Sequence, residues 1–265
     1  MKSGLQVQSA FCKRGEKNLR DCISVETMRE SDRLTIERKV SGRELMGRAA
    51  QGVFRAVEWK GSAAIVAGSG NNGGDGYALA CILQKHGIPC AVFTLSDRLS
   101  EDGGYYARKA AQMGVPIRPF AAGEGLLQTW DIVVDCLLGT GFHGEVRESY
   151  RAAIGEINQS GAYVVSVDIN SGMNGDTGAC GDVVRSDLTV TIGFVKRGLV
   201  MPQAGQYMKR LVCTDIGIDL CREERKLCTA DEWQALSEGQ RVSGRFALCP
   251  LWLEAEVTVS LEHEI

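Results

Sequence analysis

The fold of this chain is decided by residues 63–86, which read AAIVAGSGNNGGDGYALACILQKH. Residues 63–67 are an apolar run long enough for a fully buried strand. Residues 68–76 contain five glycines, and residues 77–86 place apolar side chains at the spacing of a helix that packs on one face. A strand, a glycine-rich loop and a helix form a unit that binds phosphate, because the helix N-terminus offers free N–H groups and a partial positive charge.

The glycine-rich loop differs from two familiar nucleotide-binding loops. No Gly-Lys-Ser/Thr follows it, so it is not a nucleoside-triphosphate loop. Gly68, Gly70 and Gly73 have the spacing G-x-G-x-x-G, but that match alone is weak. The sequence NNGGDG at 71–76 adds side chains that form hydrogen bonds and are poor helix formers. A surface turn is the alternative, and the position directly after a buried strand favours a ligand site.

The composition is typical of a cytoplasmic α/β protein. The 265 residues carry 30 basic and 33 acidic side chains, so nothing indicates a surface for nucleic acid or acidic membranes. Ten cysteines are scattered without a C-x-x-C pair, and we expect buried free thiols in a reducing cytosol. No apolar stretch of about 18 residues and no apolar signal core are present, so a membrane span is not expected.

Predicted strands and helices alternate along the chain. The predicted strands, which read as apolar runs, are 63–67, 90–95, 115–119, 131–138, 163–169, 188–193 and 211–216. The predicted helices are 24–39, 41–59, 77–86, 100–113 and 148–160, with a helical turn at 123–130. This alternation predicts a mostly parallel sheet that is covered by helices on both faces.

The two ends of the chain differ from this alternating region. Residues 1–22 are polar and unpatterned, and we expect an N-terminal arm there, followed by one domain over residues 23–220. Residues 221–265 are predicted to be a C-terminal extension of unknown role. Within it, residues 229–236 favour a helix, and residues 253–261 alternate apolar and polar side chains like a half-buried edge strand.

Polar glycine loops follow three of the predicted strands. The first follows Ala67, the second follows Leu138 and the third follows Ile169. Ligands of parallel sheets bind beyond the carboxyl ends of the strands, so we expect the three loops to meet in one site. Asp135 and Asp168 lie in or directly after buried strands, where a carboxylate without a partner is costly. Each aspartate therefore needs a capping hydrogen bond, a ligand or an ion.

Four motifs in this order resemble the NAD(P)H-hydrate epimerase family, also called the YjeF N-terminal domain. They are VAGSGNNGGDG from residue 66, VVDCLLGTGFHGEVRE from residue 133, VVSVDINSGMNGDTG from residue 164 and LTVTIGFVKRGLV from residue 188. The resemblance runs from about Val25 to Ile218 and implies a Rossmann-like three-layer αβα sandwich, usually dimeric, with a bound potassium ion. It also implies a role in cofactor repair, the interconversion of the R and S epimers of the hydrates NADHX and NADPHX.

The resemblance assigns roles to residues of the three loops. The substrate is expected to contact Asp168 and two groups of loop residues, Asn71, Asn72, Gly73, Gly74, Asp75, Gly139, Thr140, Gly141, Phe142, His143, Gly144 and Glu145. The expected potassium ligands are Asn72, Asp135 and Ser171, whose amide, carboxylate and hydroxyl oxygens suit a hard cation. In the expected reaction the ring nitrogen expels the hydroxyl and water returns on the other face. Asp168 is the candidate that donates and accepts the proton in turn.

Three neighbouring residues carry further expectations. Lys196 stands where the family usually has a lysine, and it is expected either to meet phosphate or Asp168 or to be exposed to solvent. His143 is expected to be solvated, and we assign it no catalytic role. The family usually has proline where this chain has Asn170, which leaves the geometry of the turn from Asp168 to Ser171 for the structure to decide.

Two alternatives to an epimerase remain at this point. One is a non-catalytic nucleotide-binding or dimerisation scaffold, like relatives in messenger-RNA decapping factors, and the presence of Asp168 and the NNGGD sequence argues against it. The other is a generic dinucleotide-binding dehydrogenase. Against it, no acidic residue closes a strand about 20 residues after the glycine loop, where a ribose-binding residue is expected, and Asp97 is only a weak candidate.

The sequence also suggests partners. The helix expected at 41–59 has a wide apolar stripe, and Met46, Val53, Phe54 and Trp59 on it predict a homodimer through the N-terminal helices. Too few residues follow Asp219 for the dehydratase domain that continues many bacterial members of the resembled family. A separate NAD(P)H-hydrate dehydratase is therefore the expected partner enzyme.

Overall fold

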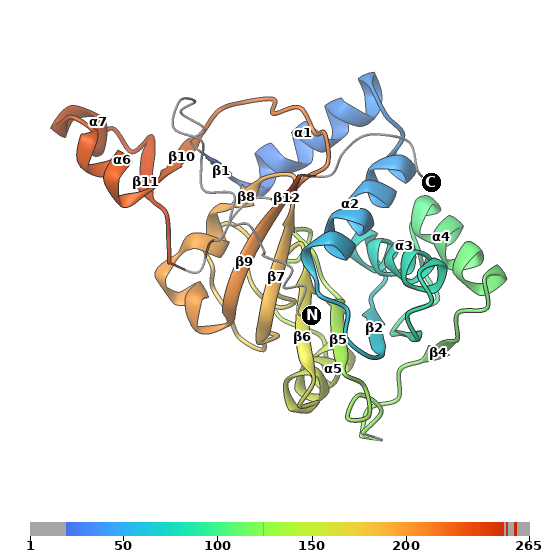
Figure 1. Cartoon of the computed structure of the whole chain (residues 1–265). Helices are drawn as coiled ribbons and strands as arrows, with labels where there is room; N and C mark the ends of the chain where they lie inside the picture. Colours follow the sequence, from blue (N-terminus) through green and yellow to red (C-terminus); the bar gives the residue numbers. More distant parts are fainter. Residues whose placement is uncertain (1–19, 124, 252, 254–256, 259–265) are drawn as a thin grey trace, which may run out of the picture.

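The main body of the protein is one large parallel sheet. The computed structural model describes residues 20–123, 125–251, 253 and 257–258. The strands of this sheet are β2 (Ala63–Ala67), β3 (Cys90–Thr94), β4 (Ile117–Pro119), β5 (Ile132–Cys136), β6 (Tyr163–Val167), β7 (Ser186–Ile192), β9 (Met208–Asp215) and β12 (Val257–Thr258). They lie in the order β12-β9-β7-β6-β5-β2-β3-β4, with every neighbouring pair parallel (Figure 1). The predicted parallel sheet is confirmed.

Helices cover both faces of this sheet. The long helices are α1 (Val25–Arg38), α2 (Gly42–Ala56), α3 (Asn71–Lys85), α4 (Glu101–Gln112) and α5 (Glu148–Gln159). Side chains of β2 alternate between two cores, because successive residues of a strand point to opposite faces. Ala63 and Ile65 share a core with α2, α3 and α4, whereas Ala64 and Val66 share the other core with α5. The three-layer αβα sandwich is therefore confirmed.

Helix α3 begins earlier than the sequence pattern predicts. The predicted loop ran from Gly68 to Gly76, but Asn71 is already the first residue of α3. Glycines persist inside its first turns because neighbouring groups approach closely. A Cβ on Gly73 would lie 2.1 Å from the carbonyl oxygen of Gly68, and one on Gly74 would lie 2.6 Å from Met46. The glycines are thus required by packing around the helix, and the assignment of this stretch to a loop was wrong.

A second, smaller sheet joins both ends of the described chain to its centre. Its strands are ordered β11-β10-β1-β8 and span Phe246–Leu248, Arg225–Cys228, Arg20–Ile23 and Val195–Lys196. Strand β1 is parallel to β8 and antiparallel to β10. The boundary predicted after residue 22 falls inside β1, and the boundary predicted at residue 221 lies between β8 and β10 of the same sheet.

The chain after residue 196 contains short elements. Two 3₁₀ helices, η1 and η2, span Arg197–Val200 and Pro202–Gln206, and two short helices, α6 and α7, span Ala230–Ala235 and Glu238–Val242. The predicted helix at 229–236 is confirmed by α6. Of the alternating stretch 253–261, the described residues are Leu253, which bridges to Leu211, and β12, which extends the edge of the large sheet next to β9. The remainder of that stretch lies outside the described residues.

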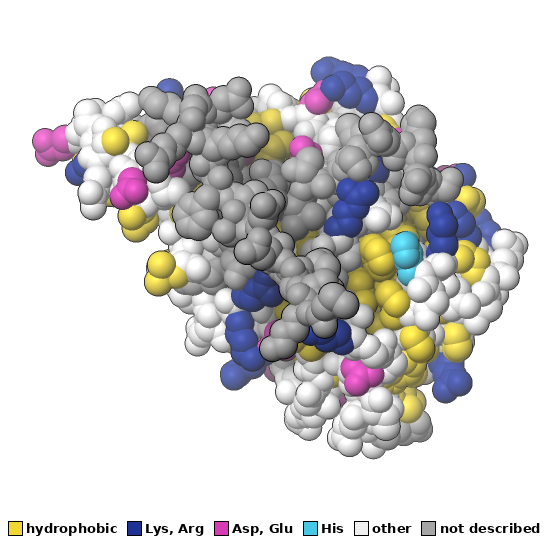
Figure 2. All heavy atoms as spheres, viewed as in Figure 1, with side chains coloured by type: hydrophobic (Ala, Val, Ile, Leu, Met, Phe, Trp, Pro, Cys, Tyr) yellow, Lys and Arg dark blue, Asp and Glu magenta, His cyan; other side chains and the backbone are white. Residues whose placement is uncertain are grey.

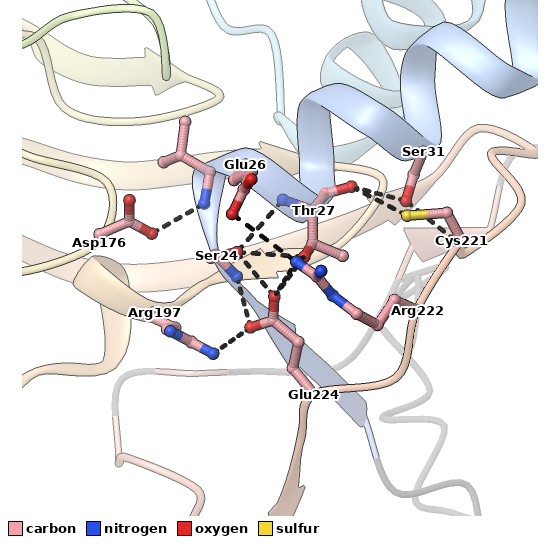
Figure 3. A network of polar contacts seen from close by, with 10 residues as sticks. Ser24, Glu26, Thr27, Ser31, Asp176, Arg197, Cys221, Arg222 and Glu224 are labelled. Atoms are coloured by element: carbon pink, nitrogen blue, oxygen red, sulfur yellow. Dashed lines mark hydrogen bonds and ion pairs between the residues drawn. The ribbon is translucent and has the colours of Figure 1, made fainter.

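Glu224 ties the C-terminal segment to the beginning of α1 (Figure 3). Its carboxylate accepts hydrogen bonds from the backbone N–H of Ser24 at 2.9 Å, the hydroxyl of Ser24 at 2.7 Å and the hydroxyl of Thr27. Arg197 forms an ion pair with the same carboxylate, which is only 8% exposed. Asp176 accepts the N–H of Val25 at 2.8 Å, so two carboxylates serve the positive end of α1.

Most apolar side chains of α2 are buried against the protein's own core. Met46 and Val53 are buried in the core beneath α2, although the dimer prediction counted them as spare surface. Phe54 and Trp59 are half-buried, and Phe54 stacks on the ring of His86 with centroids 4.6 Å apart. Figure 2 shows hydrophobic side chains beside a histidine on the face that contains α2 and α3. The dimer stays a prediction, with a smaller apolar patch to support it.

Two predictions from composition find their counterparts in the described residues. All nine described cysteines are free thiols, and six of them are buried. Among the helices of the described chain, none is long and apolar enough to cross a membrane. The cytoplasmic location stays a prediction.

Candidate active site

One cavity lies between the first two glycine loops and Asp168, which directly precedes the third loop. Its volume is about 690 Å³, and α1, α2 and α3 contribute to its wall together with the ends of β5, β6 and β7. Ten predicted substrate residues line it, namely Asn71, Asn72, Asp75, Gly139, Thr140, Gly141, Phe142, His143, Glu145 and Asp168. Gly73, Gly74 and Gly144 do not line it. The two buried glycines Gly73 and Gly74 act indirectly, because they let α3 approach its neighbours closely.

Asp168 follows β6 with a strained backbone. Its φ of +68° is the one positive value among the non-glycine residues that the structure describes. Such a conformation costs free energy and concentrates at functional sites. Its Oδ1 accepts a hydrogen bond from Lys196 at 2.5 Å and a long one from the N–H of Ile192 at 3.5 Å. Oδ2 faces Gly139 instead, since a Cβ on Gly139 would lie 3.5 Å from it.

Lys196 is buried rather than exposed. Only 1% of its side chain is accessible, so the expectation of a solvated lysine was wrong. The ammonium group donates to Oδ1 of Asp168 at 2.5 Å, to the carbonyl of Ile192 at 2.7 Å and to the hydroxyl of Thr191 at 3.1 Å. An ammonium has three hydrogens, and all three are used here. Lys196 therefore serves as the partner of Asp168 and has no hydrogen left for a phosphate.

Two further carboxyl groups share the cavity with Asp168. Burial and the charges of Asp168 and Asp32 raise the pKa of Asp75 well above its usual value, and Lys196 offsets only part of this. Burial and the charge of Asp168 likewise raise the pKa of Asp32, again against the opposing effect of Lys196. Sequence reasoning missed Asp32, because it lies on α1, ahead of all three loop motifs. Asp32 is the last residue of the sequence MRESD at residues 28–32, and this short stretch was the one sequence signal for it.

Two of the three predicted potassium ligands, Asp135 and Ser171, are in direct contact, and the third, Asn72, lines the cavity. Ser171 donates its hydroxyl to Oδ1 of Asp135 at 2.5 Å and its N–H to Oδ2 at 3.0 Å. Burial raises the pKa of Asp135, while hydrogen bonds from Ser171, Ser166 and the N–H of Leu137 oppose that rise. Asn72 is 6% exposed, and neither atom of its amide has a hydrogen-bond partner among the described residues.

This donor set fits a potassium ion and does not fit a transition metal. The amide oxygen of Asn72, which no described residue contacts by a hydrogen bond, and the desolvated carboxylate of Asp135 are oxygen ligands of the kind that a hard cation prefers. Within the described part of the chain, no cluster of three histidine, cysteine, aspartate or glutamate side chains is arranged to hold a metal.

Asn170 replaces the rigidity that a proline would provide. It is fully buried, and its Nδ2 faces the carbonyls of Val184 and Tyr207 at 2.9 and 3.0 Å. Nδ2 also lies 3.0 Å from the hydroxyl of Ser186, and Oδ1 accepts the hydroxyl hydrogen of Thr189 at 2.6 Å. These side-chain contacts of Asn170 fix the turn between Asp168 and Ser171, so a proline is not needed to make the turn rigid.

The second loop borders the cavity with mostly backbone contacts. The N–H of Phe142 donates to the carbonyl of Gly139 at 3.0 Å, which closes a tight turn. Arg29 on α1 reaches the carbonyl of Thr140 at 3.4 Å. His143 is exposed, and its Nδ1 lies 3.0 Å from the carbonyl oxygen of Gly141, in agreement with a solvated histidine.

The fold and the site together define an α/β protein with a carboxylate-lined ligand site at the carboxyl ends of a parallel sheet. Residues 42–198 match the family described as YjeF-related protein N-terminus. The chain therefore belongs to the YjeF-related protein N-terminus family.

Similar proteins carry related names. The NAD(P)H-hydrate epimerase of Limosilactobacillus fermentum is 36% identical over 201 residues, covering 73% of this chain and 95% of that protein. The epimerase of Rhodopirellula baltica is 33% identical, covering 75% of this chain and 85% of that protein. The bifunctional NAD(P)H-hydrate repair enzyme Nnr of Coxiella burnetii is 37% identical over 198 residues, which are 72% of this chain. The matched part spans only 40% of that longer enzyme.

A solved structure has the same fold. The yeast protein ynu0 superposes with a TM-score of 0.60 at 24% sequence identity, covering 67% of this chain and 82% of that protein. At this level of identity the likeness establishes the shared fold alone.

Proposed function

We propose that this chain is an NAD(P)H-hydrate epimerase that interconverts the R and S epimers of NADHX and NADPHX. The observation that carries the proposal is the pairing of Asp168 with the buried Lys196 in a cavity that two glycine loops border. A scaffold has no need for a strained carboxylate that is held by a buried ammonium group. The names of the two similar epimerases support the same reaction.

The cavity suits a nicotinamide hydrate. Its volume of about 690 Å³ lies within the range of small-molecule sites. The N-terminus of α3 opens into it through Asn71 and Asn72, and the free N–H groups at a helix N-terminus favour the phosphates of a dinucleotide. The carboxyl groups of Asp168 and Asp75 then remain for the hydrated ring.

Asp168 transfers the proton that epimerisation requires. Loss of the hydroxyl needs a proton donor, and return of water needs a base. Lys196 holds Oδ1 of Asp168 and leaves Oδ2 toward the cavity, so Oδ2 is the oxygen that exchanges the proton. Asn72, Asp135 and Ser171 would hold a potassium ion, which would supply a fixed positive charge to the site.

The decisive experiment incubates the protein with the separated hydrate epimers and follows their interconversion. Asp168→Asn keeps the size of the side chain but removes the titratable group, so epimerisation is expected to fall about a hundredfold while substrate binding weakens only modestly. Asp97→Asn is the matched control, because Asp97 is exposed outside the cavity, and it is expected to keep full activity.

The same pair of variants separates the competing functions. Absence of interconversion by the unmodified protein would favour a scaffold. A dehydrogenase would instead lose cofactor binding in Asp97→Asn, the candidate ribose-binding residue. A separate NAD(P)H-hydrate dehydratase that uses the product, and a cytoplasmic location, complete the proposal.

A further inference from the structure

We propose that Asp75 is a second catalytic residue, which acts as a carboxylic acid opposite the carboxylate of Asp168. This inference rests on the proposed epimerase function. It assigns the proton for the departing hydroxyl to Asp75 and gives Asp168 the proton of the entering water. It replaces the simpler scheme in which Asp168 performs both steps in turn.

The two carboxyl groups reach the cavity from different structural elements. Asp75 lies on α3, one turn after Asn72, and Asp168 lies at the end of β6, yet both line the same cavity. An epimerisation moves the oxygen substituent from one face of the ring to the other. A donor and an acceptor carried on two elements suit that requirement better than one carboxyl group that must serve both faces.

The hydrogen bonds of the site separate the two roles. Asp168 receives a hydrogen bond from the ammonium group of Lys196 and forms an ion pair with it. The other two hydrogens of Lys196 are taken by Thr191 and Ile192, so none is left for Asp75. No described residue donates a hydrogen bond to Asp75. Burial without a hydrogen-bond donor favours the neutral form of a carboxyl group, the form that can give a proton.

The charges around Asp75 act in the same direction. Burial raises the pKa of Asp75 most, the charges of Asp168 after β6 and of Asp32 on α1 raise it further, and Lys196 on β8 opposes them. Cys136 on β5 is a neutral thiol, because burial raises its pKa well above the usual value. Helices α2 and α4 add Met46, Ala49 and Asp102 to the same cavity wall.

Asp75 and Asp168 together supply and take up every proton that the reaction moves. The carbon–oxygen bond breaks with its electron pair going to oxygen, which takes the proton of Asp75 and leaves as water. The lone pair of the ring nitrogen forms an iminium ion. Water then adds to the other face, and its proton passes to Asp168. The resulting state, with Asp168 protonated and Asp75 ionised, is the one that converts the opposite epimer.

The first test compares Asp75→Asn with Asp75→Glu in steady-state epimerisation of both hydrates. Loss of the acid is expected to lower kcat about a hundredfold with little change in KM, and Asp75→Glu is expected to recover part of the loss. A residue that only binds substrate would raise KM and leave kcat near the unmodified value, which would overturn the inference. A melting curve for each variant establishes that it is folded.

The second test uses the dependence of kcat/KM on pH and does not require Asp75 to be replaced. Activity is expected to fall at alkaline pH as Asp75 ionises. Because the charge of Asp32 raises the pKa of Asp75, Asp32→Asn is expected to move this fall to lower pH. Glu30→Gln, an exposed change on the same helix, is the control and is expected to leave the profile unchanged.

The outcomes distinguish this inference from the proposed function. An unmodified protein that does not epimerise the hydrates overturns both. Interconversion that Asp168→Asn abolishes but Asp75→Asn leaves intact overturns the role of Asp75 alone. An alkaline limb that stays in place in Asp32→Asn also contradicts that role.

Discussion

At the scale of single residues, the site is defined by the hydrogen-bond partners of its side-chain oxygens. Asp168 has one oxygen held by Lys196 and the other directed toward Gly139. Two residues later, Asn170 has its whole amide engaged by buried partners, so it anchors the turn and takes no part in the site. Asn72 shows the opposite pattern, because its buried amide has no hydrogen-bond partner among the described residues. Such a group is costly unless a ligand completes it.

The first prediction at this scale concerns the potassium ion. We expect the melting temperature of the protein to be higher in potassium chloride than in tetramethylammonium chloride of equal ionic strength, because an ion that binds only the folded state stabilises it. Asp135→Asn is expected to abolish the difference. Asp131→Asn, at the opposite end of β5, is the control that should keep it. An unmodified protein that melts identically in both salts would contradict the site.

At the scale of elements, the small sheet connects the C-terminal segment to the catalytic pair. Lys196 is the last residue of β8, and it pairs with Ile23 of β1. Strand β1 in turn pairs with β10, which begins directly after Glu224. The position of Lys196 therefore depends on strands from both ends of the described chain.

The prediction for this scale concerns the stability that Glu224 supplies. Burial raises the pKa of Glu224, but hydrogen bonds from Thr27 and Ser24 and the charge of Arg197 outweigh it, so the net pKa is lowered. A carboxylate with a lowered folded-state pKa stabilises the fold above its unfolded-state pKa, and this stability is lost as pH falls through the folded-state value. Glu224→Gln is expected to cost about 2 kcal/mol of unfolding free energy at pH 7, as for a hydrogen bond to a charged group.

Urea denaturation across a range of pH checks this expectation. The difference between the unmodified protein and Glu224→Gln should shrink as the pH falls below about 4, where the carboxylate takes up its proton. Glu223→Gln is the matched control, because the neighbouring Glu223 side chain is 79% exposed. A Glu224→Gln variant as stable as this control at pH 7 would contradict the structural role.

At the scale of the whole molecule, the remaining prediction is the homodimer. We expect the cluster of the half-buried Phe54 and Trp59 with the exposed His86, at the ends of α2 and α3, to form the contact between two copies. Sedimentation at micromolar concentration should give the mass of a dimer. Phe54→Glu is expected to give a monomer, whereas Tyr163→Glu, on another exposed apolar side chain, should stay dimeric. A monomeric unmodified protein is the result that would rule this out.

Most of the fold could be predicted because it depends on local patterns. Apolar runs such as Ala63–Ala67 and Ile132–Cys136 became buried parallel strands, since such runs are stable only with both faces covered. The convergence of three loops followed from the rule that parallel strands end at one edge. The start of α3 was missed, because glycine and asparagine are poor helix formers and only packing against Met46 and Gly68 explains them there.

The sequence by itself determined the class of fold, the order of its motifs and the candidate carboxylates of the site. Only the tertiary structure decided the state of those groups. It buried Lys196 beside Asp168 and brought Asp32 from α1 close to Asp75. Among the described residues, it left the amide of Asn72 without a hydrogen-bond partner. The physical reason is that burial, charge and hydrogen bonding depend on residues far apart in the chain, whereas strand and helix patterns depend on residues close together.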